Sequence, residues 1–352
     1  MNTQPIEAPR PSPDPYRPSW VDQLMTWIDR LPLPAWVVYL LFLLVMIVAN
    51  NARTWLDGSA PPGSFDIPRI TDGVYSVYFL ALIHYLNGVA GRALARFRPL
   101  LDASDAEFQR LTYSLTVLPA GLGYVALLAG AALALGGILL DPLAFGLTSA
   151  SPLFAWVYMV AVVTFNTALL VAFVLHGIRQ LRLIDRLYAR AAPVDMLNPA
   201  PLHALSAVTA RTGLGVILFA WFMVVQDPTP GLNPVSIFGV TTLLLLGTAS
   251  FVLPLSGMHE RLVDEKNRLL AAVSSRLSVT FDLLHANLDT QNLDRADKIN
   301  QTIASLKAER DILAHLPTWP WQPETPRVFL TAVVLPVVVW VLTALLGRLL
   351  ES

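Results

Sequence analysis

Seven long apolar stretches constrain this chain more than any other feature. They cover roughly residues 34–55, 74–90, 112–140, 153–176, 204–225, 235–255 and 328–346. A helix needs about 20 mostly apolar residues to cross the hydrocarbon core of a bilayer. Hydrophobic residues make up 55% of the chain and charged residues 14%, whereas soluble domains carry about 25% charged residues. The sequence therefore predicts an all-α, multi-pass protein of the cytoplasmic membrane, with the lipid bilayer as its solvent.

The second stretch is the shortest, and it contains His84 and Asn87. It is either a span or a helix lying on the membrane surface. Loop charges favour a span, because Arg and Lys in short loops mark the cytoplasmic side. Basic residues cluster after the second, fourth and sixth stretches, whereas the connections after the third and fifth contain none. This alternation predicts seven spans, with the amino terminus inside and the short carboxyl terminus outside. If the second stretch lay on the surface, the amino-terminal tail would be external.

Two short segments precede the spans at 34–256. Residues 1–18 contain six prolines, which predicts a disordered cytoplasmic tail. Residues 19–31 predict an amphipathic helix that begins at Ser19 and places Trp20, Trp27 and Ile28 on one face. Such a helix lies along the inner membrane interface or packs on the protein's own cytoplasmic surface.

The charged segment 257–316 predicts a cytoplasmic antiparallel helical hairpin. Apolar residues recur every three or four positions on both sides of the turn-forming sequence DTQN at 289–292. A lone pair of helices buries little apolar surface. We therefore expect the apolar seams of a coiled-coil-like pair also to contact other helices or other subunits.

The sequence HLPTWPWQPETPR at 315–327 joins the hairpin to the last span, 328–348. Pro317 ends the returning helix, because proline lacks an N–H and restricts the preceding residue. Trp319 and Trp321 are expected at the headgroup level, where an apolar ring and a polar N–H are both accommodated. Residues 317–327 thus predict a stiff interfacial elbow. It either couples the hairpin to the last span or serves as a passive anchor.

The elbow carries the one sequence resemblance. LPTWPWQPETPR, preceded by AERDILAHL and followed by an apolar span containing Pro336, resembles the carboxyl end of a group of bacterial multi-span membrane proteins. This resemblance covers roughly residues 310–348 and implies no activity. In topology alone, the chain is similar to insect odorant and gustatory receptor channels, in which four subunits associate through cytoplasmic extensions and the last helix lines a pore. No motif of that family occurs here, so the likeness rests on fold-level analogy.

The search for enzymatic motifs is negative. His259–Glu260 is followed by no second histidine at HExxH spacing, and the chain has no Walker loop, no GxSxG elbow and no cysteine. We expect no enzyme, no cofactor and no metal site. The net charge of −1 argues against nucleic acid as a partner, because proteins that bind it present a basic surface.

Polar residues inside the predicted spans are the remaining candidates, because such residues tend to face the protein interior. His84 and Asn87 interrupt the second span, and Asn166 lies in the middle of the fourth. Asn166 makes either an interhelical hydrogen bond or a contact with a permeating species. Arg211 is placed near the inner interface, where its side chain reaches the headgroups.

The function that fits these features best is a homo-oligomeric ion channel or pore lined by the last helix. An apolar constriction would act as its gate. A membrane-anchored scaffold or sensor, with a cytoplasmic partner at the hairpin, is the alternative. A facilitator for a small or lipidic substrate near His84 and Asn166 is the third hypothesis. The candidate pore-lining residues are Thr331, Val334, Leu335, Val338 and Thr343.

Overall fold

A computed structural model describes residues 14–65, 67–190, 196, 200–226, 234–289, 293–322 and 324–350. Every regular element in these residues is a helix, so the all-α prediction is confirmed for this part of the chain. The α-helices are α1 (Trp20–Asp29), α2 (Ala35–Leu56), α3 (Ile67–Phe97), α4 (Asp105–Thr116), α5 (Ala120–Leu140), α6 (Leu153–Arg190), α7 (Ala200–Gln226), α8 (Pro234–Val252), α9 (Ser256–Asp289), α10 (Leu293–His315) and α11 (Thr325–Leu350). Three short 3-10 helices separate some of them: η1 (Arg98–Leu100), η2 (Pro142–Phe145) and η3 (Leu253–Leu255).

Six helical segments are long and apolar enough to cross a membrane. They are α2, α3, α5, α6, α7 and the run that begins in α8 and continues into α9. α3 is unbroken for 31 residues, about 46 Å at 1.5 Å per residue, so the second predicted stretch does not lack length. α11 carries the seventh predicted stretch but is not among the six. The seventh span and the sidedness stay predictions.

The third predicted stretch differs from the structure at its start. The sequence prediction began the span at residue 112, but α4 ends at Thr116 and α5 begins only at Ala120. Pro119 explains the break, because it cannot donate to the preceding turn and it favours an extended conformation in the residue before it. The transmembrane part of this stretch is therefore α5 alone.

The amino-terminal segment packs against this break. Tyr16 donates from its hydroxyl to the Val117 carbonyl at 2.9 Å, and the Ala120 amide donates to the Arg17 carbonyl at 2.9 Å. The prediction of a disordered tail over residues 1–18 is thus wrong for residues 14–18, and residues 1–13 lie outside the described part of the chain. The cause is the set of backbone groups that the helix break leaves for the tail to pair with.

α1 begins with a reciprocal capping box. The Asp22 amide donates to Ser19 Oγ at 3.3 Å, and the Ser19 amide donates to Asp22 Oδ2 at 3.2 Å. Its buried face is formed by Val21, Met25 and Ile28, whereas Trp27 is 56% exposed. The predicted face was therefore displaced by part of a turn. α1 packs on the protein's own helices, and its contact with lipid stays a prediction.

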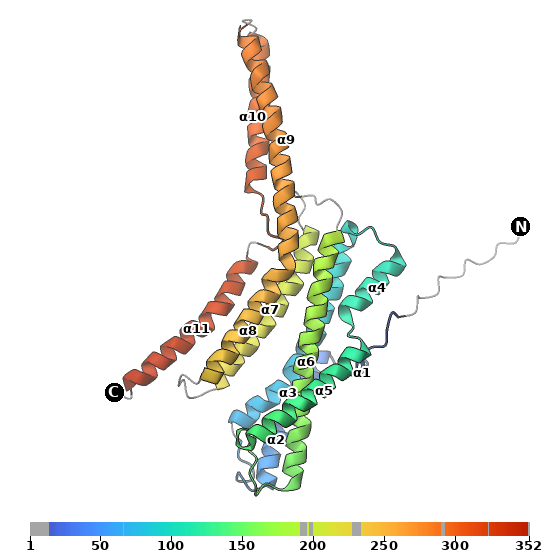
Figure 1. The fold of residues 1–352 in the computed structure, drawn as a ribbon, viewed down its shortest axis with the longest axis vertical. Helices are drawn as coiled ribbons and strands as arrows, with labels where there is room; N and C mark the ends of the chain where they lie inside the picture. The colour runs from blue at the N-terminus through green and yellow to red at the C-terminus, as the bar shows by residue number, and fades with distance from the viewer. Residues whose placement is uncertain are drawn as a thin grey trace, which may run out of the picture.

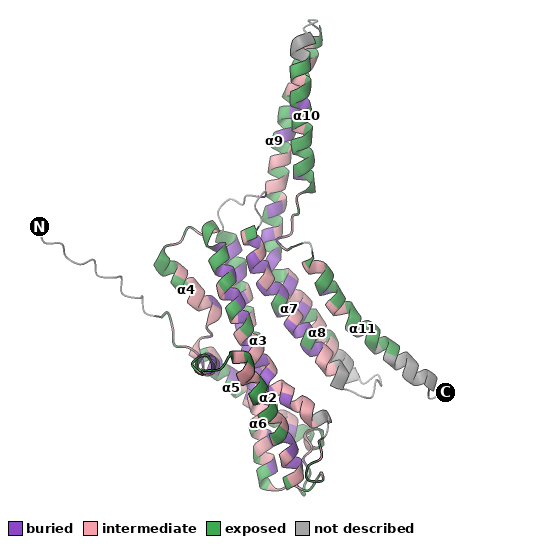
Figure 2. Cartoon of the chain, turned by 180° about the vertical axis from the view of Figure 1, so that it is seen from behind, coloured by how far each residue is buried: buried purple, intermediate pink, exposed green. Residues whose placement is uncertain are grey.

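The helices form an elongated molecule (Figure 1). α9 and α10 lie side by side and project from the helical body, and α11 diverges from α7 and α8. Burial follows this arrangement: buried residues gather where α3, α6 and α7 meet, whereas the hairpin and α11 are mostly exposed (Figure 2). Two clusters of buried apolar side chains form that core, one near Phe97 and Tyr188 and one near Phe79 and Phe173.

Small residues set the closest helix contacts. At Gly130 of α5, an added Cβ would lie 2.5 Å from the backbone of Ala168 in α6. At Gly213 of α7, it would lie 2.5 Å from the Gly247 carbonyl of α8. These glycines let the backbones approach without a side chain between them, as in membrane helix pairs generally.

Candidate functional site

The elbow tryptophans belong to a column of five stacked rings, which we call the aromatic column. Trp319 stacks on Trp321 with centroids 4.3 Å apart and an interplanar angle of 5°. His259 of α9 stacks on the other face of Trp319 at 4.0 Å. Phe251 of α8 continues the column, 5.1 Å from Trp321 and 4.5 Å from Phe329 of α11. The column therefore connects the base of the hairpin, the elbow and the start of the last helix.

This packing gives the two tryptophans protein contacts that the sequence did not predict. Both are half-buried against the protein's own α8 and α9, and their placement among lipid headgroups stays a prediction. The helix start also differs, because α11 already includes Pro326 in its first turn, where proline costs no hydrogen bond. The extended part of the elbow is thus shorter than the predicted 317–327.

Hydrogen bonds fix the elbow to α9 beside the column. His259 Nδ1 lies 3.0 Å from the Thr318 carbonyl, and since a carbonyl only accepts, Nδ1 is the protonated nitrogen. Lys266 Nζ donates to the carbonyls of Ala314 and Leu316 at 2.7 and 2.9 Å, at the carboxyl end of α10. A cation at this position also complements the helix dipole. Two residues of α9 therefore hold the end of the hairpin and the start of the elbow.

α11 has little packing of its own. Phe329 is the one buried side chain among those that the structure describes in this helix. Its ring covers Gly213 of α7, where an added Cβ would lie 2.9 Å from the ring. Beyond Val333, the described side chains of α11 are exposed.

The predicted pore-lining residues lie on this exposed part. Thr331, Val334, Leu335 and Val338 are all exposed, and Thr331 Oγ1 donates back to the Arg327 carbonyl at 2.9 Å. The side chain of Thr343 lies outside the described part of the structure. The structure thus leaves the four described candidates accessible, and their role in a pore stays a prediction.

The hairpin buries one seam and exposes further apolar residues. Val273 and Leu277 of α9 pack with Ile303 and Leu313 of α10. Val279 and Leu283, one turn apart on α9, are 58% and 53% exposed, and Ile312 of α10 is 59% exposed. Val279, Leu283 and Ile312 are thus more than half exposed in the described chain, although most other exposed residues of the two helices are polar.

His84 and Asn87 have different partners. His84 Nδ1 lies 2.7 Å from the Tyr39 hydroxyl, and its Nε2 lies 3.2 Å from Asp29 Oδ1. Asn87 Oδ1 lies 2.7 Å from His176 Nε2 of α6. His176 is 4% exposed and was not singled out from the sequence, although it is the first ionisable residue after a long apolar run.

Asn166 lies elsewhere. It lines a cavity of about 320 Å³ with Asn50, Arg69 and Asp72, and its Oδ1 is buried without a hydrogen-bond partner. Ten residues separate it from His176, about 15 Å along α6. His84 and Asn166 therefore have different neighbours, and the facilitator site near them stays a prediction.

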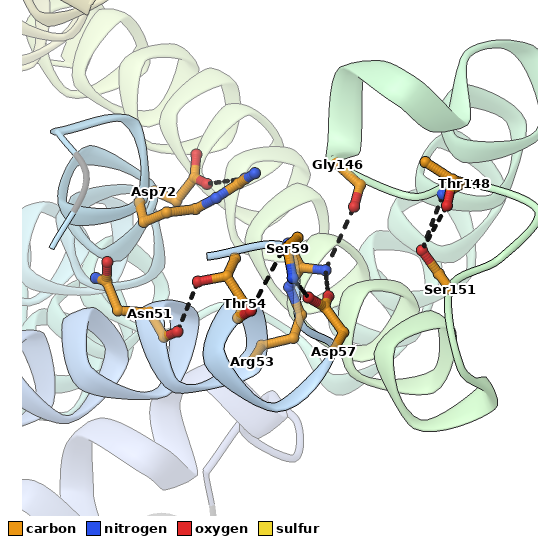
Figure 3. A network of polar contacts seen from close by, with 10 residues as sticks. Asn51, Arg53, Thr54, Asp57, Ser59, Asp72, Gly146, Thr148 and Ser151 are labelled. Atoms are coloured by element: carbon orange, nitrogen blue, oxygen red, sulfur yellow. Dashed lines mark hydrogen bonds and ion pairs between the residues drawn. The ribbon is translucent and has the colours of Figure 1, made fainter. Parts of the chain in front are cut away.

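A polar network fixes the end of α2 to the loop before α6 (Figure 3). Arg53 pairs with Asp57 at 2.9 Å, with both side chains 3% exposed, and donates to the Gly146 carbonyl at 3.4 Å. Arg69 pairs with Asp72 at 3.6 Å. Arg53 lies at the end of the first predicted span, and Arg69 lies in the connection 56–73. The predicted orientation places this connection outside, where unpaired positive charge is disfavoured. Their pairing with carboxylates reduces that conflict.

Polar side chains from α6 and α1 fill the break between α4 and α5. Arg179 Nη1 donates to the carbonyls of Ser114 and Val117 at 3.0 and 2.8 Å. Asp22 Oδ2 accepts from the Leu118 amide at 3.1 Å. Burial raises the pKa of the Asp22 carboxyl, against hydrogen bonds from Ser19 and Leu118 that lower it. The cluster satisfies backbone groups that the break exposes, so its role is structural.

The comparisons with known proteins identified no relative. The chain matches no protein-family model, and neither curated proteins nor solved structures give a significant match.

Proposed function

We propose that this chain is the subunit of a homo-oligomeric membrane pore, with α11 at the subunit interface around the pore. The observation that carries the proposal is that the elbow connects two exposed apolar surfaces. One is formed by α11 side chains such as Val334, Leu335 and Val338, and the other is the exposed apolar set on α9 of the hairpin, Val279 and Leu283.

The hairpin surface argues for a protein partner. Lipid covers apolar side chains on α11, but a charged hairpin that projects from the membrane helices meets water. Leaving Val279 and Leu283 in water forfeits about 25 cal/mol for each Å² of apolar surface. A second copy is the simplest partner, because it presents the same surface and most soluble oligomers are symmetric homo-oligomers.

The divergence of α11 argues for its place between subunits. Membrane helices associate through close van der Waals contact, yet α11 packs on α7 only through its first turns. Neighbouring copies of α11 would supply the missing contacts. A ring of Val334, Leu335 and Val338 would then form an apolar constriction that closes by dewetting.

The aromatic column supplies the coupling. Movement of the hairpin base displaces His259, which stacks directly on Trp319. Through Trp321 and Phe251, that displacement reaches Phe329 at the start of α11. A signal at the hairpin would in this way reorient the pore-lining helix.

Cross-linking tests the interface. The chain has no cysteine, so Val338→Cys introduces a unique thiol. In liposomes, oxidation should convert this variant into covalent dimers. Leu128→Cys on α5, at a position 71% exposed, is the matched control and should stay monomeric. Equal cross-linking of both positions, or none at Val338, would contradict the interface.

Flux through reconstituted protein tests the pore. Wild-type protein should release a small ion from loaded liposomes, and Val338→Asn should raise the basal flux because a polar ring wets the constriction. Leu128→Asn, which lies away from α11, should leave flux unchanged. An absence of flux for both wild type and Val338→Asn, in liposomes where cross-linking shows the oligomer, would contradict the pore.

The exposed apolar set on the hairpin also favours a second function, a scaffold that binds a cytoplasmic partner. The two functions differ in what Val279→Glu combined with Leu283→Glu does. Loss of self-association favours the pore. Intact self-association with loss of a captured partner favours the scaffold.

A further inference from the structure

An arginine-lined hollow lies between α3, α7 and the elbow. It has a volume of about 280 Å³ and is lined by Arg92 and Arg96 of α3, His203 and Arg211 of α7, and Gln322 and Thr325 at the start of α11. None of its lining residues is acidic. None of the three arginines forms an ion pair within the part of the chain that the structure describes. Among the residues that the structure describes, the hollow thus concentrates positive charge without a counter-charge.

The histidine in this hollow is also unsatisfied. His203 Nε2 is shielded from solvent and has no hydrogen-bond partner. Buried polar atoms are normally paired, so this ring adds an unsatisfied polar group beside the hollow. A ligand that offers acceptor oxygens would supply a partner for the arginines.

An apolar groove adjoins the hollow. It has a volume of about 530 Å³ and is lined by side chains of α2, α3 and α7, among them Leu43, Tyr85 and Leu218. Arg211 lines both spaces, and its guanidinium lies 6.0 Å from the centre of the Tyr85 ring. One side chain therefore stands between a cationic hollow and an apolar groove.

We propose that these two spaces form a binding site for an anionic glycerophospholipid. The phosphate occupies the hollow, because guanidinium groups bind phosphate oxygens in pairs. An acyl chain occupies the groove between α3 and α7. A soluble phosphate uses only the hollow, so the adjoining groove is what selects an amphiphile.

The position of the site agrees with this ligand. Arg92 and Arg96 lie at the end of α3 that is predicted to be cytoplasmic, and anionic lipids attract basic side chains at that leaflet. Gln322 and Thr325 place the headgroup against the elbow and the first turn of α11. The bound lipid would therefore hold the start of α11 against α3 and α7. The inference does not depend on the pore, because binding is measured without flux.

Lipid titration of the delipidated full-length protein tests the site. In neutral detergent, native mass spectrometry should show that phosphatidylglycerol binds and that phosphatidylcholine with the same acyl chains binds much more weakly. Arg92→Gln combined with Arg96→Gln and Arg211→Gln should weaken phosphatidylglycerol binding about tenfold or more, because the variant loses the charged donors to the phosphate.

The matched control removes the same charge elsewhere. Arg182, Arg186 and Arg190 form a second exposed row on α6, and changing all three to Gln should leave phosphatidylglycerol binding nearly unchanged. Equal weakening by the two triple variants would mean unspecific attraction to surface charge and would overturn the site. If the first triple variant does not fold, the single change at exposed Arg92 gives the same comparison against Arg182→Gln.

Glycerol 3-phosphate distinguishes a lipid from a free phosphate. It should compete only weakly with phosphatidylglycerol, and Leu218→Asn in the groove should weaken the lipid while sparing glycerol 3-phosphate. Competition as strong as that of phosphatidylglycerol itself would overturn the lipid assignment in favour of a soluble anion. Equal binding of phosphatidylcholine would show that the arginines do not recognise charge.

Discussion

α5 and α11 are both apolar helices, yet they differ in how they find partners. α5 packs along α6, with Gly130 against the Ala168 backbone, and Thr167 Oγ1 donates to the Gly130 carbonyl at 2.8 Å. α11 packs on α7 through Phe329, Ala332 and Val333, and its described side chains beyond Val333 are exposed. α5 thus has a buried face along its length, from Gly123 to Ile138, whereas the described burial of α11 ends at Val333. This difference is what the proposed assembly through α11 requires.

The largest effect is expected at the close contact between α5 and α6. Gly130→Leu should abolish the folded, monodisperse protein, because even a Cβ collides with backbone that cannot rotate away. We expect a loss above the usual overpacking cost of about 1–3 kcal/mol. Gly136→Leu is the control on the same helix, with open space around its Cα. Fluorescence-detected size exclusion after heating measures both. A stable Gly130→Leu variant would remove the contrast between α5 and α11.

Disruption of the aromatic column should affect only the carboxyl-terminal part of the chain. Trp319→Ala removes the ring between His259 and Trp321 and should cost about 2 kcal/mol, below the 3–5 kcal/mol of a fully buried tryptophan. Hydrogen exchange should rise in α11 and at the base of the hairpin but not in α5 or α6. Trp36→Ala, at a position 69% exposed, is the control. Faster exchange throughout the chain would contradict a local coupling element.

The helix break should depend on one hydrogen-bond acceptor. Asp22→Ala leaves the Leu118 amide unsatisfied and should cost about 1–3 kcal/mol. Asp22→Asn keeps an oxygen acceptor for that amide and should cost less. Thermal unfolding in detergent compares the two variants. If they are equally destabilised, the carboxylate charge rather than the acceptor is what the break requires.

The smallest effect is expected at the end of α10. Lys266→Met removes the donor to the Ala314 and Leu316 carbonyls and should cost about 0.3–1 kcal/mol. The change should appear as faster hydrogen exchange in the last turn of α10. Lys307 is an exposed residue of α10, and Lys307→Met should leave the last turn of that helix unchanged. Equal effects would mean that Lys266 acts only through net charge.

The helices were predictable from the sequence, and their partners were not. Apolar runs and 3–4 spacing depend on neighbouring residues, so they revealed α2, α6 and the two arms of the hairpin. Pro119 indicates the break before α5, but the sequence prediction gave more weight to the apolar residues on both sides of it. The aromatic column and the arginine-lined hollow bring together residues far apart in the chain, such as Arg92 and Arg211. Local sequence patterns do not show such contacts. The two tryptophans therefore indicated contact with lipid headgroups, and their stacking with Phe251 and His259 was not predicted.

The central claim is that α11 finds its missing contacts in other copies of the same chain. Electron cryo-microscopy of the full-length protein in lipid nanodiscs tests it most directly. The account predicts several copies of this 38.5 kDa chain, with their α11 helices converging on a common axis and their hairpins in contact. Single copies with lipid on all exposed sides of α11 would contradict it.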